Sequence, residues 1–362
     1  MSIESFLLRM PKVELHVHLE GAIRPATLLH LAARHDVALP AGDEAGLREW
    51  FRFSSFEHFV EVYLTCSSCL RDPEDFYLLA ADFLAEQARQ NVVYSEVHFT
   101  ISTHVGNGAD GDEVMDALDE AIRDGERRLG VRMRLVPDIV RNVGPEAADL
   151  TVDWALAGMG RGVVALGLSG SEARFASEPF AEHFATAEQA GLHRVAHASE
   201  HAGPESIRSA LDVCRAERIG HGVRAVEDSA LVADLARWGI PLEVCPTSNL
   251  CLGVVPTLAE HPFDALRRAG VRLSVNSDDP PLFDTTLTDE YLRLHRAFGY
   301  TPAELAGLSL AALRHAFLEP GEAEAWEREL RGQFVELGTE LLGEAVEPAL
   351  GPGELAAAPA GE

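Results

Sequence analysis

The chain has 362 residues, of which 47% are hydrophobic, and a formal net charge of −28 at pH 7. A charge this negative repels nucleic-acid phosphates and anionic membranes, so we expect neither as a partner. The sequence has no stretch of roughly 20 apolar residues that could span a membrane, and its N-terminus lacks the basic region and cleavage site of a signal peptide. We therefore expect a cytoplasmic protein with a large core.

Short segments rich in β-branched residues alternate with longer amphipathic segments along the chain. The first predicted strand (12–20, KVELHVHLE) is separated from the second (91–100) by a long helical insert at 25–90. Between the strands, apolar residues recur with the period of a helix, and the last helices extend to residue 342. The remaining strands are expected at 131–140, 161–168, 192–198, 218–221, 240–245 and 271–276.

Strands that alternate with helices are typical of a parallel sheet. Eight repeats of this unit predict an α/β fold that closes into a (β/α)₈ TIM barrel, and not an open doubly wound sheet. No linker divides residues 1–345, so we expect one barrel domain with a helical insert after strand 1 and extra C-terminal helices. Residues 346–362 are rich in Ala, Gly, Pro and Glu, and we predict a disordered tail there.

Residues that can bind a metal recur where the predicted strands end. His16 and His18 lie two positions apart in the first strand, so their side chains project from the same face. His197 ends the fifth strand and Asp278 follows the eighth. The carboxyl ends of barrel strands form the catalytic face, and zinc favours histidine nitrogen with a carboxylate oxygen. We therefore expect these four residues to be ligands, although each alone is also explained as a helix cap, a hydrogen-bonded histidine or a solvated turn.

Six short motifs follow one another along the predicted barrel. They are ELHVHLEGA (14–22), LSGSE (168–172), HASE (197–200), RIGHG (218–222), VCPTSN (244–249) and SDDP (277–280). Together, and in this order, they resemble the motifs of the adenosine deaminase family within the amidohydrolase superfamily. The resemblance spans essentially the whole barrel. It implies a metal-dependent aminohydrolase whose substrate is a small 6-aminopurine nucleoside.

The resemblance implies that the four expected ligands hold zinc, which lowers the pKa of a water molecule so that hydroxide is available near neutral pH. His221 would orient this water and take or stabilise its proton. Glu200 would be the general acid that protonates purine N1, after which the adjacent carbon is attacked and ammonia leaves. A carboxyl group among apolar walls should have a raised pKa, which suits this role. Without the motif, Glu200 could be a helix N-terminal carboxylate and His221 a structural histidine.

The number of metal ions follows from the lysine content. Binuclear amidohydrolases usually bridge their two metals with a modified lysine on the fourth strand. Lys12 is the only lysine in the chain, and it lies at the wrong end of the first strand. We therefore expect one zinc ion per chain.

The resemblance also assigns substrate contacts. Asp279 would bond to purine N7 through a shared or donated proton. The backbone N–H of Gly170 would meet N3, where a side chain would obstruct close approach. Glu20 would lie near the 5′ group, at a position where adenosine deaminases typically carry Asp. A Glu resembles relatives that act on adenine or on 6-amino-6-deoxyfutalosine, a menaquinone-pathway nucleoside with a benzoate in place of the 5′-hydroxyl.

The choice of substrate depends on these departures from the family motif. One added methylene moves the Glu20 carboxylate by about a bond length and alters which 5′ group fits. The segment YSEVHFTIS (94–102) lacks the acidic residue associated with the adenine-specific branch. We therefore favour aminodeoxyfutalosine, with adenosine as the alternative and adenine behind both. Arg52 is a candidate partner for a 5′ extension, whereas Arg141 is expected to brace the rim.

Two other classes of protein stay open. Another mononuclear metal-dependent barrel hydrolase, acting on an ester or a cyclic amide, would share the ligands. It would not need Glu200, Gly170 and Asp279 together, a set that matches a purine. A catalytically silent binding protein on the same scaffold should have lost a ligand or Glu200, and the sequence retains them all.

Overall fold

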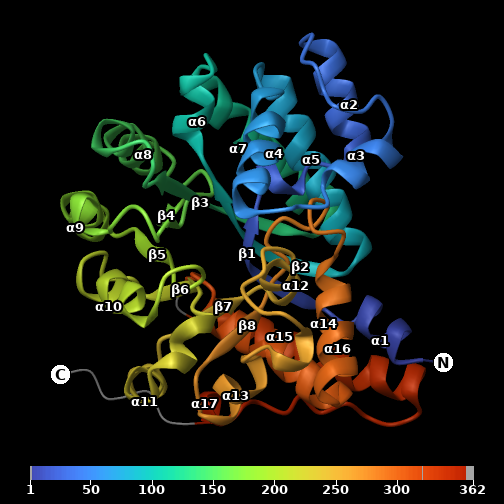
Figure 1. Ribbon diagram of the computed structural model, residues 1–362. Coiled ribbons are helices and arrows are strands. Elements are labelled where there is room, and N and C mark those ends of the chain that lie inside the picture. Colours follow the sequence, from blue (N-terminus) through green and yellow to red (C-terminus); the bar gives the residue numbers. More distant parts are fainter. Residues whose placement is uncertain (1, 320, 356–362) are drawn as a thin grey trace.

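Eight parallel strands surrounded by helices form a (β/α)₈ barrel in the computed structural model, which describes residues 2–319 and 321–355 (Figure 1). The strands pair in chain order, and every pair is parallel. The predicted fold is therefore confirmed. The strands are β1 (Lys12–His18), β2 (Val92–Phe99), β3 (Arg132–Val140), β4 (Ala165–Ser169), β5 (His193–Ala198), β6 (Arg218–His221), β7 (Leu242–Val244) and β8 (Leu273–Val275).

The barrel closes between β1 and the segment that follows β8. The backbone N–H of His18 donates to the carbonyl of Asp278 at 2.8 Å, and the N–H of Asp278 donates to the carbonyl of His16 at 3.2 Å. Two residues before Asp278, the Asn276 side-chain oxygen accepts a hydrogen bond from Leu15 N at 2.8 Å. Three residues expected to bind a metal thus lie on the seam that closes the sheet.

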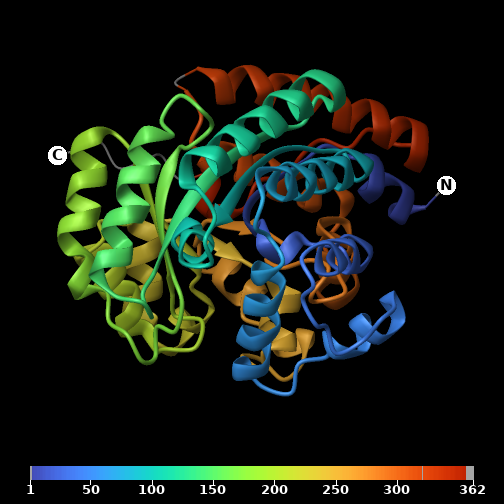
Figure 2. The ribbon, with the colours of Figure 1, turned by 90° about the horizontal axis from the view of Figure 1, so that it is seen from above.

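The helical insert between β1 and β2 consists of four helices, which lie at the upper side of Figure 1 and are seen from above in Figure 2. They are α2 (Pro25–Arg34), α3 (Glu44–Trp50), α4 (Phe56–Ser68) and α5 (Pro73–Arg89). Helix α5 begins with Pro73 at its first turn and a reciprocal cap between Asp72 and Asp75, which satisfies backbone donors at the helix start. The apolar side of α4 turns towards the barrel mouth.

The remaining helices cover the outside of the barrel and the chain ends. Helix α15 packs against β1 and β8 at the seam, and α16 packs against α15 and α1. Within the described residues no helix is long and apolar enough to cross a membrane. These helices are α1 (Ile3–Arg9), α6 (Ile101–Gly106), α7 (Gly111–Leu129), α8 (Pro145–Ala157), α9 (Ala181–Ala190), α10 (Pro204–Asp212), α11 (Ser229–Trp238), α12 (Pro246–Cys251), α13 (Phe263–Arg268), α14 (Leu287–Phe298), α15 (Pro302–His315), α16 (Glu322–Leu342) and α17 (Pro352–Leu355).

Part of the expected disordered tail is ordered. Residues 346–355 pack against the barrel: Val346 is 3% exposed, and Ala349 N donates to the Ala303 carbonyl at 2.8 Å. The Glu354 carboxylate accepts a hydrogen bond from His315 at 2.7 Å. The composition of the tail did not indicate these contacts because only a few apolar and polar side chains make them. The rest of the predicted tail, 356–362, lies outside the described residues.

Lys12 starts β1 at the end of the barrel opposite the histidines, and its side chain is fully buried. Its ammonium group donates to the carbonyls of Leu7 at 2.7 Å and Met10 at 2.9 Å, at the C-terminal end of α1. Burial lowers the pKa of Lys12 to about 7.

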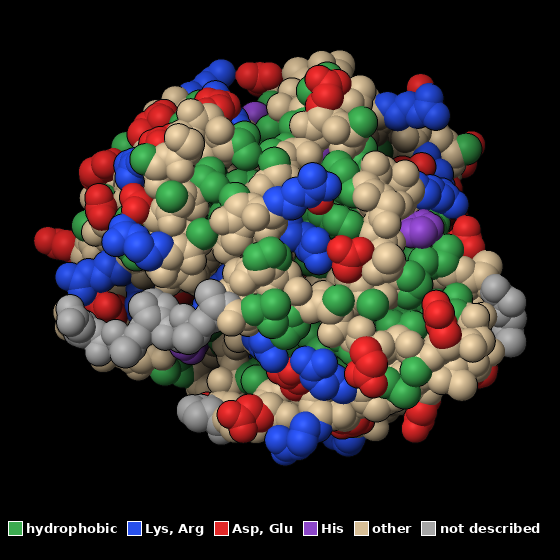
Figure 3. Space-filling view, turned by 90° about the horizontal axis from the view of Figure 1, so that it is seen from below, with side chains coloured by type: hydrophobic (Ala, Val, Ile, Leu, Met, Phe, Trp, Pro, Cys, Tyr) green, Lys and Arg blue, Asp and Glu red, His purple; other side chains and the backbone are tan. Residues whose placement is uncertain are grey.

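On the face of the molecule seen from below, acidic and basic side chains are interspersed with apolar ones (Figure 3).

Candidate active site

Four side chains from three places in the barrel converge at the end where the strands finish, as the sequence predicts. His16 and His18 come from β1, His197 from β5, and Asp278 from the turn after β8. The Nε2 atoms of His18 and His197 lie 3.2 Å apart. One Asp278 oxygen lies 3.5 Å from His16 Nε2 and 3.4 Å from His18 Nε2. All four residues are buried.

The hydrogen bonds around these histidines point their Nε2 atoms into the cluster. His16 Nδ1 donates to Glu243 at 2.8 Å, and His197 Nδ1 donates to the Leu168 carbonyl at 3.0 Å. In the neutral form of each ring both Nε2 atoms are then free of protons, and His16 Nε2 has no hydrogen-bond partner although it is buried. Burial lowers the pKa of His16, but Asp278 and Glu243 outweigh burial and raise it to about 10, so a metal ion at this nitrogen would have to displace a proton. Burial also lowers the pKa of His18 to about 4, which keeps that ring neutral. Unprotonated imidazole nitrogens beside a carboxylate are the ligands of a divalent metal such as zinc, so this group fits one.

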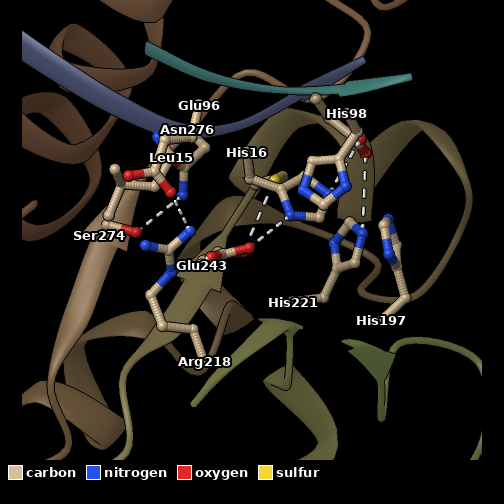
Figure 4. Close-up of polar contacts among 12 residues, drawn as sticks. Leu15, His16, Glu96, His98, His197, Arg218, His221, Glu243, Ser274 and Asn276 are labelled. Carbon is tan, nitrogen blue, oxygen red and sulfur yellow. Dashed lines mark hydrogen bonds and ion pairs between the residues drawn. The ribbon is translucent and has the colours of Figure 1, made fainter. Parts of the chain in front are cut away.

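A buried chain of charges supports His16 from behind and was not foreseen from the sequence. Glu243, on β7, accepts the His16 hydrogen bond and also accepts from Arg218 Nε at 2.6 Å (Figure 4). Arg218, on β6, forms a second ion pair with Glu96 on β2. The sequence signal that could have identified these three residues is a charged side chain inside a predicted strand. All three are fully buried, and an unpaired charge is not tolerated there.

Replacing Glu243 with glutamine should weaken metal binding by about 10- to 100-fold, the usual effect of losing a partner that orients a ligand. The amide offers His16 a weaker acceptor and leaves Arg218 with one carboxylate. Isothermal titration of the apoprotein with zinc measures the affinity. Glu217→Gln, at a half-buried carboxylate that accepts from His193 on the neighbouring strand, is the control. Wild-type affinity in Glu243→Gln would contradict the orienting role.

A second pair, His98 on β2 and Asp138 on β3, lies behind His18. His98 Nδ1 donates to Asp138 at 2.9 Å, and the other Asp138 oxygen lies 4.0 Å from His18 Nδ1. A Cβ at Gly167 would stand 1.8 Å from an Asp138 oxygen, so the glycine in β4 makes room for this carboxylate. Sequence reasoning missed both residues because they lie inside strands and outside the motifs.

Glu200 and His221 stand beside the cluster. The His221 Nδ1 atom lies 3.9 Å from a Glu200 oxygen, and its Nε2 lies 3.9 Å from Asp278. Ser199, His221 and Asp278 have φ angles of 57°, 60° and 64°, a left-handed conformation that costs energy in residues with a side chain and is common at functional sites. The backbone is therefore strained at three points beside the cluster: after β5, at the end of β6 and after β8.

The Glu200 carboxyl differs from the expectation of a raised pKa. Burial does raise it, but the charges of His221 and His201 and a 3.0 Å hydrogen bond from His201 outweigh burial, so the pKa is lowered. Asp279 behaves in the opposite way. Burial and the charge of the adjacent Asp278 raise its pKa well above the ordinary value, which favours the protonated carboxyl that can donate a hydrogen bond.

A cavity of about 220 Å³ opens directly on the cluster. Gly170 lines one wall with φ 94°, and a Cβ there would lie 2.5 Å from the Asn142 side-chain oxygen. The apolar side of α4 forms another part of the wall. No Lys or Arg lies among its lining residues, which are His18, Phe56, Phe59, Val60, Tyr63, Leu64, Thr100, Thr103, Val140, Asn142, Val143, Ser169, Gly170, Ser171, His197, Glu200, His221, Leu252, Asp278 and Asp279.

Glu20 does not line the cavity, in contrast to the other residues expected to bind substrate. It lies in a 3₁₀ turn (Glu20–Ala22) and not in β1, and its side chain is fully buried. One oxygen accepts from Thr100 N at 2.8 Å, from the Thr100 hydroxyl at 2.6 Å and from His104 at 3.0 Å. Burial raises the pKa of Glu20, but these donors outweigh it and lower the pKa to about 2. Glu20 thus reaches the cavity through Thr100, and its charge also helps to raise the pKa of Tyr63 at the cavity wall.

The two arginines considered for the rim occupy different places. Arg141 donates to the carbonyls of His197 at 2.8 Å and Ser169 at 3.3 Å, so it braces the rim as expected. Arg52 pairs with Glu49 at 3.2 Å, its side chain is 79% exposed, and it does not line the cavity.

Taken together, a (β/α)₈ barrel with a buried cluster of histidines and an aspartate at its strand ends, open to a small cavity, defines a metal-dependent barrel hydrolase. Residues 11–330 match the family model described as adenosine deaminase, and the chain belongs to this family.

Named relatives narrow the activity. The chain is 41% identical over 325 residues to the aminodeoxyfutalosine deaminase of Streptomyces coelicolor, covering 89% of this chain and 84% of that one. It is 38% identical over 329 residues to the adenine deaminase of the same organism, covering 91% and 95%. These matches, with the family, identify the chain as a hydrolytic deaminase.

Solved structures agree with this assignment. Adenine deaminase from Arthrobacter aurescens superposes with a TM-score of 0.85 at 30% identity, over 90% of this chain and 99% of that one. An amidohydrolase from Burkholderia ambifaria, solved with bound Zn, superposes with a TM-score of 0.87 at 27% identity, over 94% and 95%. A divalent metal at the histidine–aspartate cluster is consistent with both the geometry and this relative.

Proposed function

We propose that this chain removes the 6-amino group of aminodeoxyfutalosine, using one zinc ion held by His16, His18, His197 and Asp278. The observation that carries the proposal is the cavity. Its walls combine one side of the metal cluster with Glu200, Asp279 and the backbone of Gly170. A flat purine needs donors on its ring nitrogens and an acid beside them, and this set supplies both.

Zinc is the proposed metal because three imidazoles and one carboxylate are a typical zinc ligand set. When bound, the ion would make a water molecule acidic enough to attack near neutral pH. A single ion is supported by β4, which contains no lysine, and by Lys12, which lies at the opposite end of the barrel.

The protein groups would then move the protons. Glu200, in its acid form, gives a proton to N1, and the proton stays on the product. His221 takes a proton from the attacking water and can return it to Glu200, whose oxygen is 3.9 Å away. The hydroxyl proton on the tetrahedral carbon leaves with ammonia. Because the pKa of Glu200 is low in the free protein, its acid form belongs to the substrate complex, where the purine displaces water.

The purine itself would be held by two donors. The protonated Asp279 donates to N7, and the Gly170 N–H donates to N3, which the absence of a side chain at 170 permits. Tyr63 and Thr100, both at the cavity wall, separate Glu20 from this space. Glu20 would therefore influence the 5′ group by positioning Thr100, and not by direct contact.

The walls around the outer part of the cavity favour a substrate with an apolar 5′ group. Phe56, Val60 and Leu64 of α4 face this space, with Val143 also at the wall. Leu64 is 51% exposed and Val143 60% exposed, so they form an apolar mouth. An aromatic ring would pack there with its carboxylate in water, whereas a 5′-hydroxyl would gain nothing from these apolar side chains. This supports aminodeoxyfutalosine over adenosine.

Adenine is a second candidate because the cavity is small. Its volume of about 220 Å³ lies below the roughly 300–1,000 Å³ of ordinary ligand pockets. Several relatives, with 34% identity in the Vibrio parahaemolyticus protein and 38% in that of Streptomyces coelicolor, are named adenine deaminases. A free base would fill the inner part of the cavity and leave the α4 mouth unused.

The test is ammonia release from aminodeoxyfutalosine, adenosine and adenine, measured side by side on the zinc-loaded protein. We expect kcat/KM for aminodeoxyfutalosine to exceed that for the other two by at least about 10-fold, the scale of a single pocket contact. Highest activity on adenine would assign the small-cavity alternative. Zinc binding without turnover of any of the three purines would overturn the purine assignment and leave the metal site.

A further inference from the structure

Glu172, in the loop after β4, holds the segment that carries Glu200. Its carboxylate accepts hydrogen bonds from four consecutive backbone N–H groups and one hydroxyl. One oxygen accepts from the N–H of Glu200 at 2.7 Å, His201 at 2.6 Å and Ala202 at 2.9 Å, and the other from Ser199 N at 2.7 Å and the Ser206 hydroxyl.

Apart from Glu172, segment 199–202 is held mainly by Arg224, whose backbone N–H donates to the Ser199 carbonyl at 3.0 Å and whose side chain donates to the His201 carbonyl at 2.6 Å. It lies between β5 and α10, outside any helix or strand, and Ser199 is in the left-handed region with φ 57°. Buried or half-buried N–H groups need an acceptor, and a negative charge placed among several of them is the strongest one available. The Glu172 carboxylate therefore sets the path of the backbone at Glu200 itself.

The same loop ties Glu200 to the rest of the site. Two positions before Glu172, Gly170 lines the cavity, and three positions before Glu200, His197 faces the metal cluster. Arg141 connects the two loops on the other side, through the carbonyls of Ser169 and His197. A shift of Glu172 would move the acid relative to both the purine contact and the metal cluster.

We propose that Glu172 is a positioning residue that acts through Glu200, holding its carboxyl at the distance from N1 that proton transfer requires. This inference rests on the proposed function, because it takes Glu200 as the general acid. Glu172 does not line the cavity, so it would contact no substrate atom. Its removal should slow the chemical step and leave substrate binding nearly unchanged.

Glu172→Gln is the sharpest variant because it keeps the size of the side chain. An amide has one acceptor oxygen and one donor NH₂ group, so in either orientation the NH₂ group faces at least one backbone N–H that it cannot satisfy. Displacement by about 1 Å can cost about 100-fold in rate. We expect kcat to fall about 100-fold, with KM changed by less than about 3-fold and zinc content unchanged.

A double-mutant cycle separates positioning from general damage. If Glu172 acts through Glu200, adding Glu172→Gln to Glu200→Gln should lower kcat no further. Independent losses that multiply would overturn the proposal. Glu205→Gln is the matched control, since Glu205 is exposed and accepts one N–H bond, from Gly203, the residue that follows the segment. Its kcat should equal that of the wild type.

A measurement that needs no substrate keeps the inference distinct from the proposed function. Backbone hydrogen exchange at 199–202 should be slow in the wild type and faster in Glu172→Gln, while the strands stay protected. Unchanged exchange together with unchanged kcat would overturn the role of Glu172. If none of the three purines reacts with the wild type, the proposed function fails while the exchange result still decides the positioning. If Glu172→Gln folds poorly, Glu172→Asp provides the second variant. It keeps the charge and should retain part of the wild-type kcat and part of the protection from hydrogen exchange at 199–202.

Discussion

Glu200→Gln is expected to retain the metal and lose almost all turnover. The glutamine amide has the shape of the acid but cannot give a proton to N1, so the purine carbon stays unreactive. General acid catalysis contributes about 10²–10⁴-fold, and we expect kcat to fall by that range. Ammonia release under saturating substrate measures the loss, and elemental analysis measures zinc per chain.

The control for this experiment is Glu205→Gln, a neighbouring carboxylate outside the cavity. Full activity in Glu200→Gln would exclude the acid role, and another group would have to supply the proton. Loss of zinc together with activity would instead show that Glu200 supports the metal cluster. The two outcomes are therefore read from different assays.

Asp278→Asn should remove metal binding as well as activity. The substitution replaces the only carboxylate among the four proposed ligands with a neutral amide. Loss of a partner behind a ligand costs about 10- to 100-fold in affinity, and loss of the ligand itself should cost more than about 100-fold. Zinc titration of the apoprotein measures this directly, without any substrate.

Thermal unfolding provides a second readout for Asp278. A ligand that binds only the folded state raises the melting temperature with its concentration. Added zinc should therefore stabilise the wild-type apoprotein, and at the same concentrations should leave Asp278→Asn unchanged. Asp284→Asn, an exposed aspartate six residues later with φ 49°, is the matched control. Wild-type zinc stabilisation in Asp278→Asn would remove Asp278 from the ligand set.

The barrel could be predicted from the sequence because its evidence is repetitive. Each strand is a short apolar run followed by a helix-period segment, and eight repeats leave few other folds. The strand ends were less accurate: β4 begins at Ala165, four residues after the predicted start, because residues 161–164 form an irregular link with only isolated bridges. Helical caps and irregular links depend on local hydrogen bonds that apolar periodicity does not record.

The convergence of the three histidine side chains and the aspartate was also predictable, since each stands where a strand ends. The residues that support these side chains from behind were not predictable. Glu243, Arg218, His98 and Asp138 lie inside strands, where a pattern of alternating side chains does not distinguish the barrel interior from the helix-facing side. Glu20 was expected near the 5′ group of the substrate, and its turn directs the carboxylate towards Thr100 at the cavity wall and not into the cavity itself.

The pKa of Glu200 shows where residue-level reasoning is insufficient. A buried carboxyl alone has a raised pKa, and the sequence indicates the burial correctly. The direction is reversed by His201, the next residue, and by His221, which is distant in sequence. Such reversals depend on distances of a few ångströms between groups, which only the folded structure provides.

The buried position of Lys12 has a practical consequence. In the folded protein no side chain presents an accessible primary amine, because the single lysine is enclosed and bound to carbonyls at the end of α1. Amine-directed cross-linkers and acylating dyes should therefore leave the native side chains unmodified. Opening of the lower end of the barrel would expose the amine to reagent and, because burial alone lowers its pKa, return that pKa towards the ordinary value. The fraction of Lys12 acylated with time, measured by mass spectrometry, would report how often that end of the barrel opens.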